Sequence, residues 1–331
     1  MEIQMNYKEQ MKEHQIHWKE HGIVDHARAA DRYLGQNEKT YRHCIQNDFA
    51  DEQLFQPIRE IAKDYFDAQK IVWHGGNKQP SNNLLDSQIS FINFMEPLTI
   101  HPDTLLKCIQ VVFPEASALC GVEMFRFLDY EYIGKENYLN ERVAPEGRKR
   151  GEYCTSADGF LIYKTSCGKK VGVLIEWKFT ESYSGDSNRV KVRDDGSMTD
   201  RYMIYKGLLK AKDSPFKYKR SSELSVLFQE PLYQFIRLCL LAKEMAKVQE
   251  HGINECKVLL LSPSFNHALI EVKNRLLSFI SNDIREVFSS LLKDQNLFNY
   301  SHWESFFEPA LCAKIDDLRP WQEYIKRRYL I

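Results

Sequence analysis

The sequence of 331 residues lacks the features that define several broad classes of protein. It has no apolar run near the roughly 20 residues that span a bilayer, and its N-terminal stretch MEIQMNYKEQMKEHQ is polar and charged, unlike a signal peptide. Its eight cysteines are scattered singly, without a C-x-x-C pair. We therefore expect reduced thiols and a soluble cytoplasmic protein.

The sequence also lacks repeats and several well-known functional motifs, which excludes some classes of function without identifying one. The chain has no internal repeat, no G-x-x-x-x-G-K-[ST] phosphate loop and no recognisable DNA-reading motif. Its net charge is −1, so no global positive field points to nucleic acid, although local basic patches can still bind it. A content of 43% hydrophobic and 27% charged residues indicates an ordinary globular protein.

The pattern of apolar and turn-forming residues predicts an α/β fold with a mixed sheet flanked by helices. Helices are expected over residues 6–34 with a break at Gly22, over 53–70, over 84–98 with Pro97 as the end, and over 231–249. Strands are expected over 122–133, in a hairpin over 153–181 and over 257–264, with helices filling the rest.

The turn-rich stretch HGGNKQPSNN at 74–83 is the best candidate for a domain boundary. Before it the pattern is helical, and after it the strand-like segments begin. We expect a helical N-terminal extension at 1–75, an α/β core at 76–265 and a helical C-terminal part packed on the core at 266–331.

Three charged residues in the hairpin interrupt apolar segments of the kind that a sheet buries away from water. Asp158 begins one apolar strand, and Glu176 and Lys178 follow the apolar run 171–175. A run without alternation is typical of a strand buried on both faces, where a carboxylate is costly unless it is paired or binds a metal. Glu176 and Lys178 point to one face because they are two residues apart. The seventeen residues between Asp158 and Glu176 allow two strands to lie side by side.

Two carboxylates and one ammonium at one point favour phosphodiester hydrolysis. Carboxylates suit Mg²⁺, and a lysine beside the metal can orient or deprotonate water and offset charge on phosphate. The alternative is a surface aspartate beside an ordinary Glu–Lys salt bridge. The other E-x-K pairs, Glu255/Lys257 and Glu271/Lys273, lack the upstream aspartate, so only the segment 158–178 combines every feature.

The D-x17-E-W-K pattern resembles the PD-(D/E)XK nuclease superfamily, with Ala157 in place of the usual proline. Further stretches, spread over residues 71–266, resemble a restriction-endonuclease-like branch of prokaryotic proteins; they are IVWHGG, NLLDSQISFINFMEPL, TSADGFLIY, VLIEWKFTESY, PLYQFIRLCLLA and VLLLSPSFN. The resemblance implies that Asp158 and Glu176 are metal ligands, that Lys178 is the catalytic lysine, and that the Trp177 carbonyl is a further ligand.

The resemblance also points to supporting residues. Gln234 lies on the helix after the hairpin, where several nucleases of this superfamily carry a glutamine that supports the active site; a surface glutamine is the alternative. Gln88 occupies the element that often donates an acidic residue in this fold, so we expect it to form a hydrogen bond rather than to bind the metal. Glu131 and Glu181 are weaker candidates, more simply interpreted as solvated charges.

Histidines and basic clusters complete the set of candidates. His14, His17 and His21 share a helix face that could bind zinc, although its surroundings are polar. His74 lies in one of the family stretches without an assigned mechanism. Two basic clusters flank the hairpin and are expected to contact phosphates, with a solvated charged face as the alternative; the first is Arg148, Lys149 and Arg150, and the second is Lys206, Lys210, Lys212, Lys217, Lys219 and Arg220. Aromatic residues interleaved with the second cluster are expected to stack on exposed bases, and a polar loop is expected at 182–200.

Together these features predict an endonuclease that depends on Mg²⁺ (or Mn²⁺) and cuts DNA. Prokaryotic restriction or anti-phage defence is expected from the resemblance alone. The alternatives are an RNA substrate, a nuclease-fold subunit that binds nucleic acid or partners without cutting, and a purely structural protein. With no reading motif in the chain, specificity or activation would come from a partner protein or from self-assembly, such as a homodimer.

Overall fold

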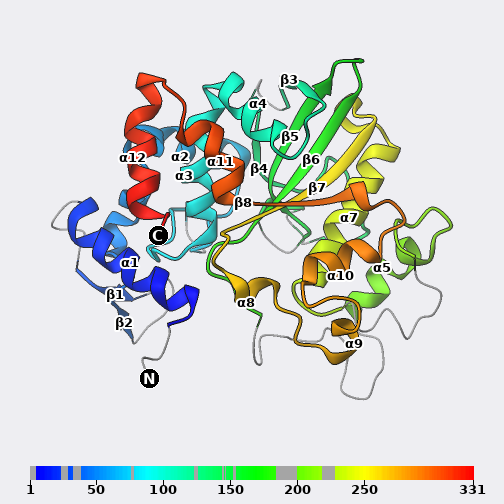
Figure 1. Ribbon diagram of the computed structural model, residues 1–331, viewed down its shortest axis with the longest axis horizontal. Coiled ribbons are helices and arrows are strands. Elements are labelled where there is room, and N and C mark those ends of the chain that lie inside the picture. The colour runs from blue at the N-terminus through cyan, green and yellow to red at the C-terminus, as the bar shows by residue number, and fades with distance from the viewer. Residues whose placement is uncertain are drawn as a thin grey trace.

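The computed structural model shows a central six-stranded sheet with helices on both faces (Figure 1). It describes residues 5–23, 29–32, 39–75, 78–122, 126–143, 145, 147–151, 154–183, 200–217 and 228–331. The strands are β3 (Ala116–Cys120), β4 (Asp129–Tyr132), β5 (Ala157–Thr165), β6 (Lys170–Trp177), β7 (Glu255–Ser262) and β8 (Phe298–His302). Their order is β3-β5-β6-β7-β8, with β4 also paired to β5. Pairing is antiparallel from β3 and β4 to β6 and parallel from β6 to β8, which confirms the predicted mixed sheet.

Two groups of helices bury the two faces of the sheet. One face packs against α3 (Ser87–Thr99), α4 (Pro102–Gln110), α11 (Trp303–Leu311) and α12 (Arg319–Arg328), together with α2 (Arg59–Gln69). The other packs against α5 (Asp200–Lys210), α7 (Leu232–Lys247) and α10 (Ile284–Ser290). The described residues also form α1 (Tyr7–Gly22), α8 (His267–Ile270), α9 (Arg275–Ser278) and a small sheet of β1 (Asp31–Arg32) and β2 (Thr40–Tyr41). Short 3-10 helices lie at Asn47–Gln53, Gln56–Ile58, Glu250–Gly252, Gln295–Leu297 and Asp316–Leu318. Within the described residues, no helix has the length and apolarity to cross a membrane.

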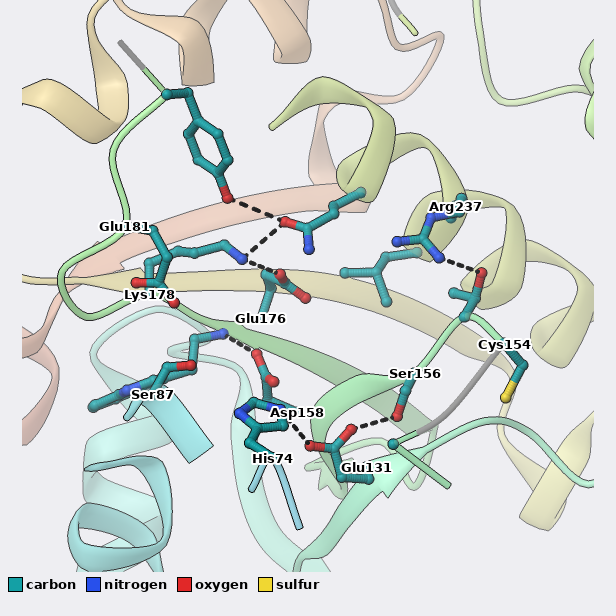
Figure 2. Close-up of a pocket in the computed structure, with 16 residues that line it drawn as sticks. His74, Ser87, Glu131, Cys154, Ser156, Asp158, Glu176, Lys178, Glu181 and Arg237 are labelled. Carbon is teal, nitrogen blue, oxygen red and sulfur yellow. Dashed lines mark hydrogen bonds and ion pairs between the residues drawn. The ribbon is translucent and has the colours of Figure 1, made fainter. Parts of the chain in front are cut away.

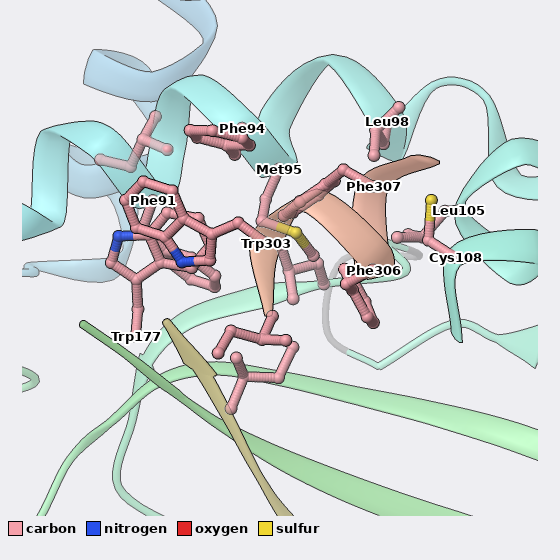
Figure 3. Close-up of a cluster of buried hydrophobic side chains, with 14 of the residues drawn as sticks. Phe91, Phe94, Met95, Leu98, Leu105, Cys108, Trp177, Trp303, Phe306 and Phe307 are labelled. Atoms are coloured by element: carbon pink, nitrogen blue, oxygen red, sulfur yellow. The ribbon is translucent and has the colours of Figure 1, made fainter. Parts of the chain in front are cut away.

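The hairpin β5–β6 lies between these two layers, which explains its unbroken apolar run. Val173, Ile175 and Trp177 of β6 face the α3 layer, whereas Leu174 faces the α7 layer. Because side chains alternate along a strand, Glu176 faces the α7 side as well. Trp177 lies among the aromatic rings of the opposite layer, and its indole stacks on that of Trp303 with 4.1 Å between ring centroids (Figure 3). The end of β6 is thereby anchored in the core.

Several expected boundaries were wrong for physical reasons. Pro97 does not end the helix it lies in, because α3 continues to Thr99. A proline at this position cannot donate to the carbonyl of Asn93 four residues earlier, and the Trp321 indole N–H donates to that carbonyl instead at 2.8 Å. The first helix does end at Gly22 as expected, but Asp31–Arg32, predicted helical, form β1.

Two strands of the sheet were not predicted. β3 is a short, partly exposed edge strand, and β8, with the sequence FNYSH, has too little apolar character to stand out. β8 also shows that the segment 266–331 is not wholly helical, since it completes the sheet beside β7. The expected helix through Glu271 is interrupted, with α8 and α9 separated by a bridge from Glu271 to Asp283. The boundaries proposed at 75/76 and 265/266 stay predictions.

Candidate functional site

Three carboxylates form a row across neighbouring strands. Gly159 of β5 pairs with Ile175 of β6, so the preceding residue, Asp158, lies opposite Glu176. On the other side, Tyr130 and Tyr132 of β4 pair with Gly159 and Ala157, which places Glu131 opposite Asp158. Directly opposed residues have Cβ atoms about 4.5–5.5 Å apart. The sheet register therefore brings together two predicted metal ligands and a third carboxylate.

Glu131 reaches this row through an unusual backbone conformation. Its φ is 48°, in the left-handed region, within a strand. Tyr130 and Tyr132 consequently lie in the two opposite hydrophobic layers, although residues two apart in a regular strand share a face. The Glu131 side chain is buried, and it accepts hydrogen bonds from Gln88 Nε2 at 2.9 Å and Ser156 Oγ at 2.8 Å. The expectation of a solvated charge at Glu131 was therefore wrong.

Lys178 lies at the end of β6, where its backbone N–H still pairs with the carbonyl of Leu261 of β7 at 2.9 Å. Its Nζ lies 2.6 Å from Glu176 Oε1 and donates to Gln234 Oε1 at 2.8 Å (Figure 2). The side chains of Lys178 and Glu176 are each only 6% exposed. The buried pair thus has a polar partner on α7, and the structure brings Gln234 to the predicted catalytic lysine.

The Trp177 peptide faces Asp158. Successive residues of a strand direct their N–H and C=O groups to opposite neighbours, and the Lys178 N–H bonds to β7, so the N–H and C=O of Trp177 are directed to β5. Its N–H donates to Asp158 Oδ2 at 2.6 Å. On the far side of the sheet, the indole N–H donates to Ser90 Oγ of α3 at 2.8 Å. Trp177 therefore couples the rigid core to the carboxylate row.

Gln88 and His74 lie on the other side of Glu131 from Ser156, and of the two only His74 lines the cavity. Gln88 donates to Glu131 and accepts from the His74 backbone N–H at 2.9 Å, so it makes hydrogen bonds as expected. The His74 ring lies 3.7 Å from Asp86 Oδ1 and 3.7 Å from Glu131 Oε1. No pattern in the sequence assigns a role to His74, and its place beside the carboxylates follows only from the fold.

The turn after Lys178 brings Glu181 and Tyr183 to the site. Phe179 N–H donates to Glu181 Oε2 at 2.5 Å, and the buried Asn266 donates to the carbonyls of Phe179 and Glu181 at 3.1 and 2.9 Å. Tyr183 OH donates to Gln234 Oε1 at 3.3 Å. Asn266 lies in the SPSFN stretch after β7, and no pattern in the sequence links it to this turn.

These residues line a cavity of about 330 Å³ (Figure 2). Its lining comprises His74, Ser87, Glu131, Gly151, Cys154, Thr155, Ser156, Asp158, Glu176, Trp177, Lys178, Glu181, Tyr183, Gln234, Arg237 and Leu238. All the residues predicted for the catalytic centre, Asp158, Glu176, Trp177, Lys178 and Gln234, contribute to it.

The charges in the cavity shift one another's pKa values. Burial and the carboxylates of Glu176 and Glu131 raise the pKa of Asp158 well above its usual range. Burial alone would lower the pKa of Lys178, but Glu176 and other neighbours raise it above the usual value. Burial would likewise lower the pKa of His74, but Asp86, Glu131 and Asp158 raise it to about 10. At Asp158, burial and the two neighbouring carboxylates therefore outweigh the positive charge of Lys178.

The donor set fits a divalent metal such as Mg²⁺. Asp158 and Glu176 are opposed carboxylates whose repulsion contributes to the raised pKa of Asp158, and a cation between them would remove that repulsion. The Trp177 carbonyl is directed to the same side of the strand as its N–H, toward β5. Carboxylate and carbonyl oxygens are the ligands of hard cations. The residues that would hold the ion are thus Asp158, Glu176 and the Trp177 carbonyl.

The basic clusters expected to bind nucleic acid have varied surroundings. Arg148 donates to the carbonyls of Ile133 and Gly134, and Arg150 donates to those of Tyr130 and Glu131. Both arginines thus hold the segment that precedes β5 against β4 and the two residues after it. Lys210, Lys212 and Lys217 are exposed, Lys149 and Lys206 are half-buried, and Lys219 and Arg220 lie outside the described residues. Phosphate contacts by all of these residues stay predictions.

The aromatic residues interleaved with the second cluster do not stack on bases as expected. Tyr202, Tyr205 and Phe216 are 2–3% exposed and belong to the hydrophobic layer around α7. The face of α5 that carries these tyrosines packs on the core, whereas Met203 and Lys210 are exposed. Tyr218 lies outside the described residues, as does most of the predicted loop at 182–200.

The histidine face of α1 is divided between two environments. His14 Nε2 lies 3.1 Å from the Arg327 carbonyl of α12. His17 and His21 are exposed and lie near Glu20, with their potential ligand atoms within 4.8 Å of one another. The three histidines therefore do not form one cluster.

The mixed sheet, with its acidic site at the end of an antiparallel hairpin, defines a protein of the restriction-endonuclease-like class. A family model described as "Restriction Endonuclease associating with ARP" matches residues 3–330, nearly the whole chain. The chain belongs to this family. Comparisons with curated proteins and with solved structures gave no match.

Proposed function

We propose that this chain is a metal-dependent nuclease of the PD-(D/E)XK type that hydrolyses phosphodiester bonds in DNA. One observation carries the proposal: Asp158, Glu176 and Lys178 converge at the end of a buried hairpin and line one cavity. Membership of a family named for restriction endonucleases supports nuclease activity. We further propose a role in restriction or anti-phage defence, with ARP, the protein in the family's name, as a partner.

Each residue has a distinct part in the proposed hydrolysis. Bound Mg²⁺ would supply a polarised water and charge neutralisation at the phosphate. Asp158, Glu176 and the Trp177 carbonyl would hold the ion, and the N–H of Trp177 keeps the Asp158 carboxylate oriented. Gln234 fixes Lys178, whose ammonium offsets negative charge that develops on the phosphate. Gln88 and Ser156 hold Glu131 beside Asp158.

Cleavage assays test this function directly. Linear, supercoiled and single-stranded DNA, and RNA as the alternative substrate, are incubated with the protein in Mg²⁺, Mn²⁺ or EDTA. We expect cleavage only with metal, and Asp158→Asn and Lys178→Met should each lower the rate at least about 10²–10³-fold. Lys273→Met is the matched control, because Lys273 forms an exposed E-x-K pair with Glu271 outside the cavity.

A second readout does not depend on activity. Mg²⁺ that binds the folded state raises the melting temperature, so the wild type should be stabilised by Mg²⁺ and Asp158→Asn should not. Cleavage that persists in both Asp158→Asn and Lys178→Met would refute the assignment of these residues to the catalytic site. Tight DNA binding without cleavage under every condition would favour the non-cutting subunit.

A further inference from the structure

The cavity poses an electrostatic problem for the substrate of the proposed function. Four carboxylates line it, those of Glu131, Asp158, Glu176 and Glu181. A polyanion that enters such a cavity is repelled unless positive groups are available to its phosphates. Among the described lining residues, the candidate cations are His74, Lys178 and Arg237.

Two of these cations are already matched by carboxylates. Lys178 Nζ lies 2.6 Å from Glu176, and the His74 ring lies 3.7 Å from both Asp86 and Glu131. Arg237, on α7, has no carboxylate within ion-pair distance in the described part of the chain. Its Nε is buried and has no hydrogen-bond partner among those residues. Burial would lower the pKa of Arg237, but Tyr205, Tyr233 and the more distant carboxylates of Glu141 and Glu230 raise it. Among the described lining residues, Arg237 is therefore the cation without a carboxylate in direct contact.

The guanidinium of Arg237 is nevertheless held in place. It lies one helical turn after Gln234, so both side chains reach the cavity from the same side of α7. Its Nη1 donates to Thr155 Oγ1 at 3.3 Å (Figure 2). The centre of the guanidinium lies 4.8 Å from the ring of Tyr233. Thr155 is itself fixed, because Glu141 accepts from its hydroxyl at 2.5 Å and from its N–H at 2.8 Å.

The position of Arg237 fits a second phosphate. Thr155 precedes Asp158 by three residues, and three residues of extended chain span at most about 10 Å. The guanidinium is thus near the carboxylate row but bound to the segment that leads into it. The planar guanidinium of arginine binds phosphate oxygens through two parallel N–H bonds, and a contact with an aromatic face helps to orient it.

We propose that Arg237, positioned by Thr155 and Tyr233, forms a phosphate-binding subsite for the DNA phosphodiester adjacent to the one that is cut. The inference rests on the proposed function, because it takes the ligand to be the nucleic-acid substrate. The subsite offsets the repulsion of the carboxylate row and sets the register of the DNA strand in the cavity.

Binding measured in EDTA tests the subsite without cleavage. The affinity of the full chain for a fluorescein-labelled DNA duplex and single strand is measured across a potassium chloride series. Each phosphate contact adds about 0.9 to the slope of log affinity against log salt for a duplex, so Arg237→Gln should lose about that much. Its affinity should fall roughly tenfold. Arg237→Lys should keep the wild-type slope but bind more weakly, because it keeps the charge and loses the fork.

Arg319→Gln is the matched control, since Arg319 forms an exposed pair with Asp316 on the other face of the sheet. Its slope and affinity should equal those of the wild type. If circular dichroism shows that Arg237→Gln does not fold, Thr155→Val replaces it and should weaken binding severalfold. An unchanged slope in folded Arg237→Gln, unchanged affinity in Thr155→Val, or a wild type that binds no DNA overturns the subsite.

The two proposals fail separately. Metal-dependent cleavage that is lost in Asp158→Asn, together with an unchanged salt slope in Arg237→Gln, supports the nuclease and overturns the subsite. A reduced slope in Arg237→Gln, together with no cleavage by the wild type, supports a phosphate contact at Arg237 and overturns the nuclease, and with it the placement of that contact beside a scissile bond.

Discussion

Glu131 illustrates how a single backbone conformation shapes the site. A non-glycine residue in the left-handed region costs of order 1–3 kcal/mol, and such residues cluster where the surrounding structure holds them for function. Arg150 donates to the Glu131 carbonyl at 3.2 Å, while Gln88 and Ser156 hold its carboxylate. The conformation is thus fixed from both the backbone and the side chain, and it turns a buried acid toward Asp158.

His74 gives a pH-dependent prediction at this scale. Carboxylates raise its folded-state pKa to about 10, against an unfolded value near 6.5. A raised folded-state pKa contributes stability that is complete below the unfolded value and is lost as pH rises through the folded value. The wild type should therefore exceed His74→Gln in stability most at pH 6.5 and below, and the difference should shrink toward pH 10.

Urea denaturation of both proteins across this pH range measures the difference. His101→Gln is the control, because His101 lies outside the cavity, at the start of α4. A stability difference for His74→Gln that stays constant from pH 6.5 to 10 would contradict the prediction.

At the scale of elements, strand β5 and helix α3 approach each other closely, and each contributes a residue to the cavity lining, Asp158 and Ser87. A Cβ added at Gly159 would lie 2.6 Å from Phe91 Cζ of α3 and 3.2 Å from Leu128. Gly159 directly follows Asp158, and α3 carries Gln88. The absence of a side chain at this position therefore sets the distance between the carboxylate row and the helix that holds Glu131.

Gly159→Ala should push α3 away from β5. We expect a loss of about 1–3 kcal/mol in the free energy of unfolding from overpacking, together with slower cleavage. Phe91→Leu in the same chain should restore part of both. Gly207→Ala on α5 is the matched control, since its Cβ meets nothing within 4 Å and alanine favours a helix. Wild-type stability in Gly159→Ala would show that the contact does not constrain the layers.

Across the whole molecule, Arg328 joins the two ends of the chain. Helix α12 lies beside α1 (Figure 1), and Arg328 is 0% exposed between them. Its guanidinium donates to Gln15 Oε1 at 3.1 Å and Gln53 Oε1 at 3.2 Å, and lies 4.2 Å from the ring of Trp18. Neutral oxygens and aromatic faces thus satisfy a buried charge that has no carboxylate partner among the described residues.

Arg328→Met should lower the melting temperature by several degrees. Acceptors left unsatisfied in a buried site cost about 1–3 kcal/mol each, and Arg328 serves more than one. At a temperature where both proteins are folded, cleavage should be unchanged, because α12 packs on the face of the sheet opposite α7. Arg327→Met, at the exposed neighbouring position, should leave both quantities at wild-type values.

Local patterns were sufficient for the hairpin and its three charges. An apolar run without alternation required burial on both faces, and a period of two placed Glu176 and Lys178 on one side. Gln234 was identifiable only through the resemblance to nucleases that carry a glutamine on the helix after the hairpin. β8 and β3 were not, because short edge or polar strands take their conformation from pairing with a neighbour.

The sequence by itself determined the mixed α/β fold and the convergence of Asp158, Glu176 and Lys178 at the end of the hairpin. Both follow from strand periodicity and the cost of buried charge, which act over short segments. Only the tertiary structure decided that Glu131, His74 and Arg237 join them. These three come from β4, the segment before α3, and α7, and their convergence depends on sheet register and helix packing. Contacts between distant segments leave no local pattern for sequence reasoning to detect.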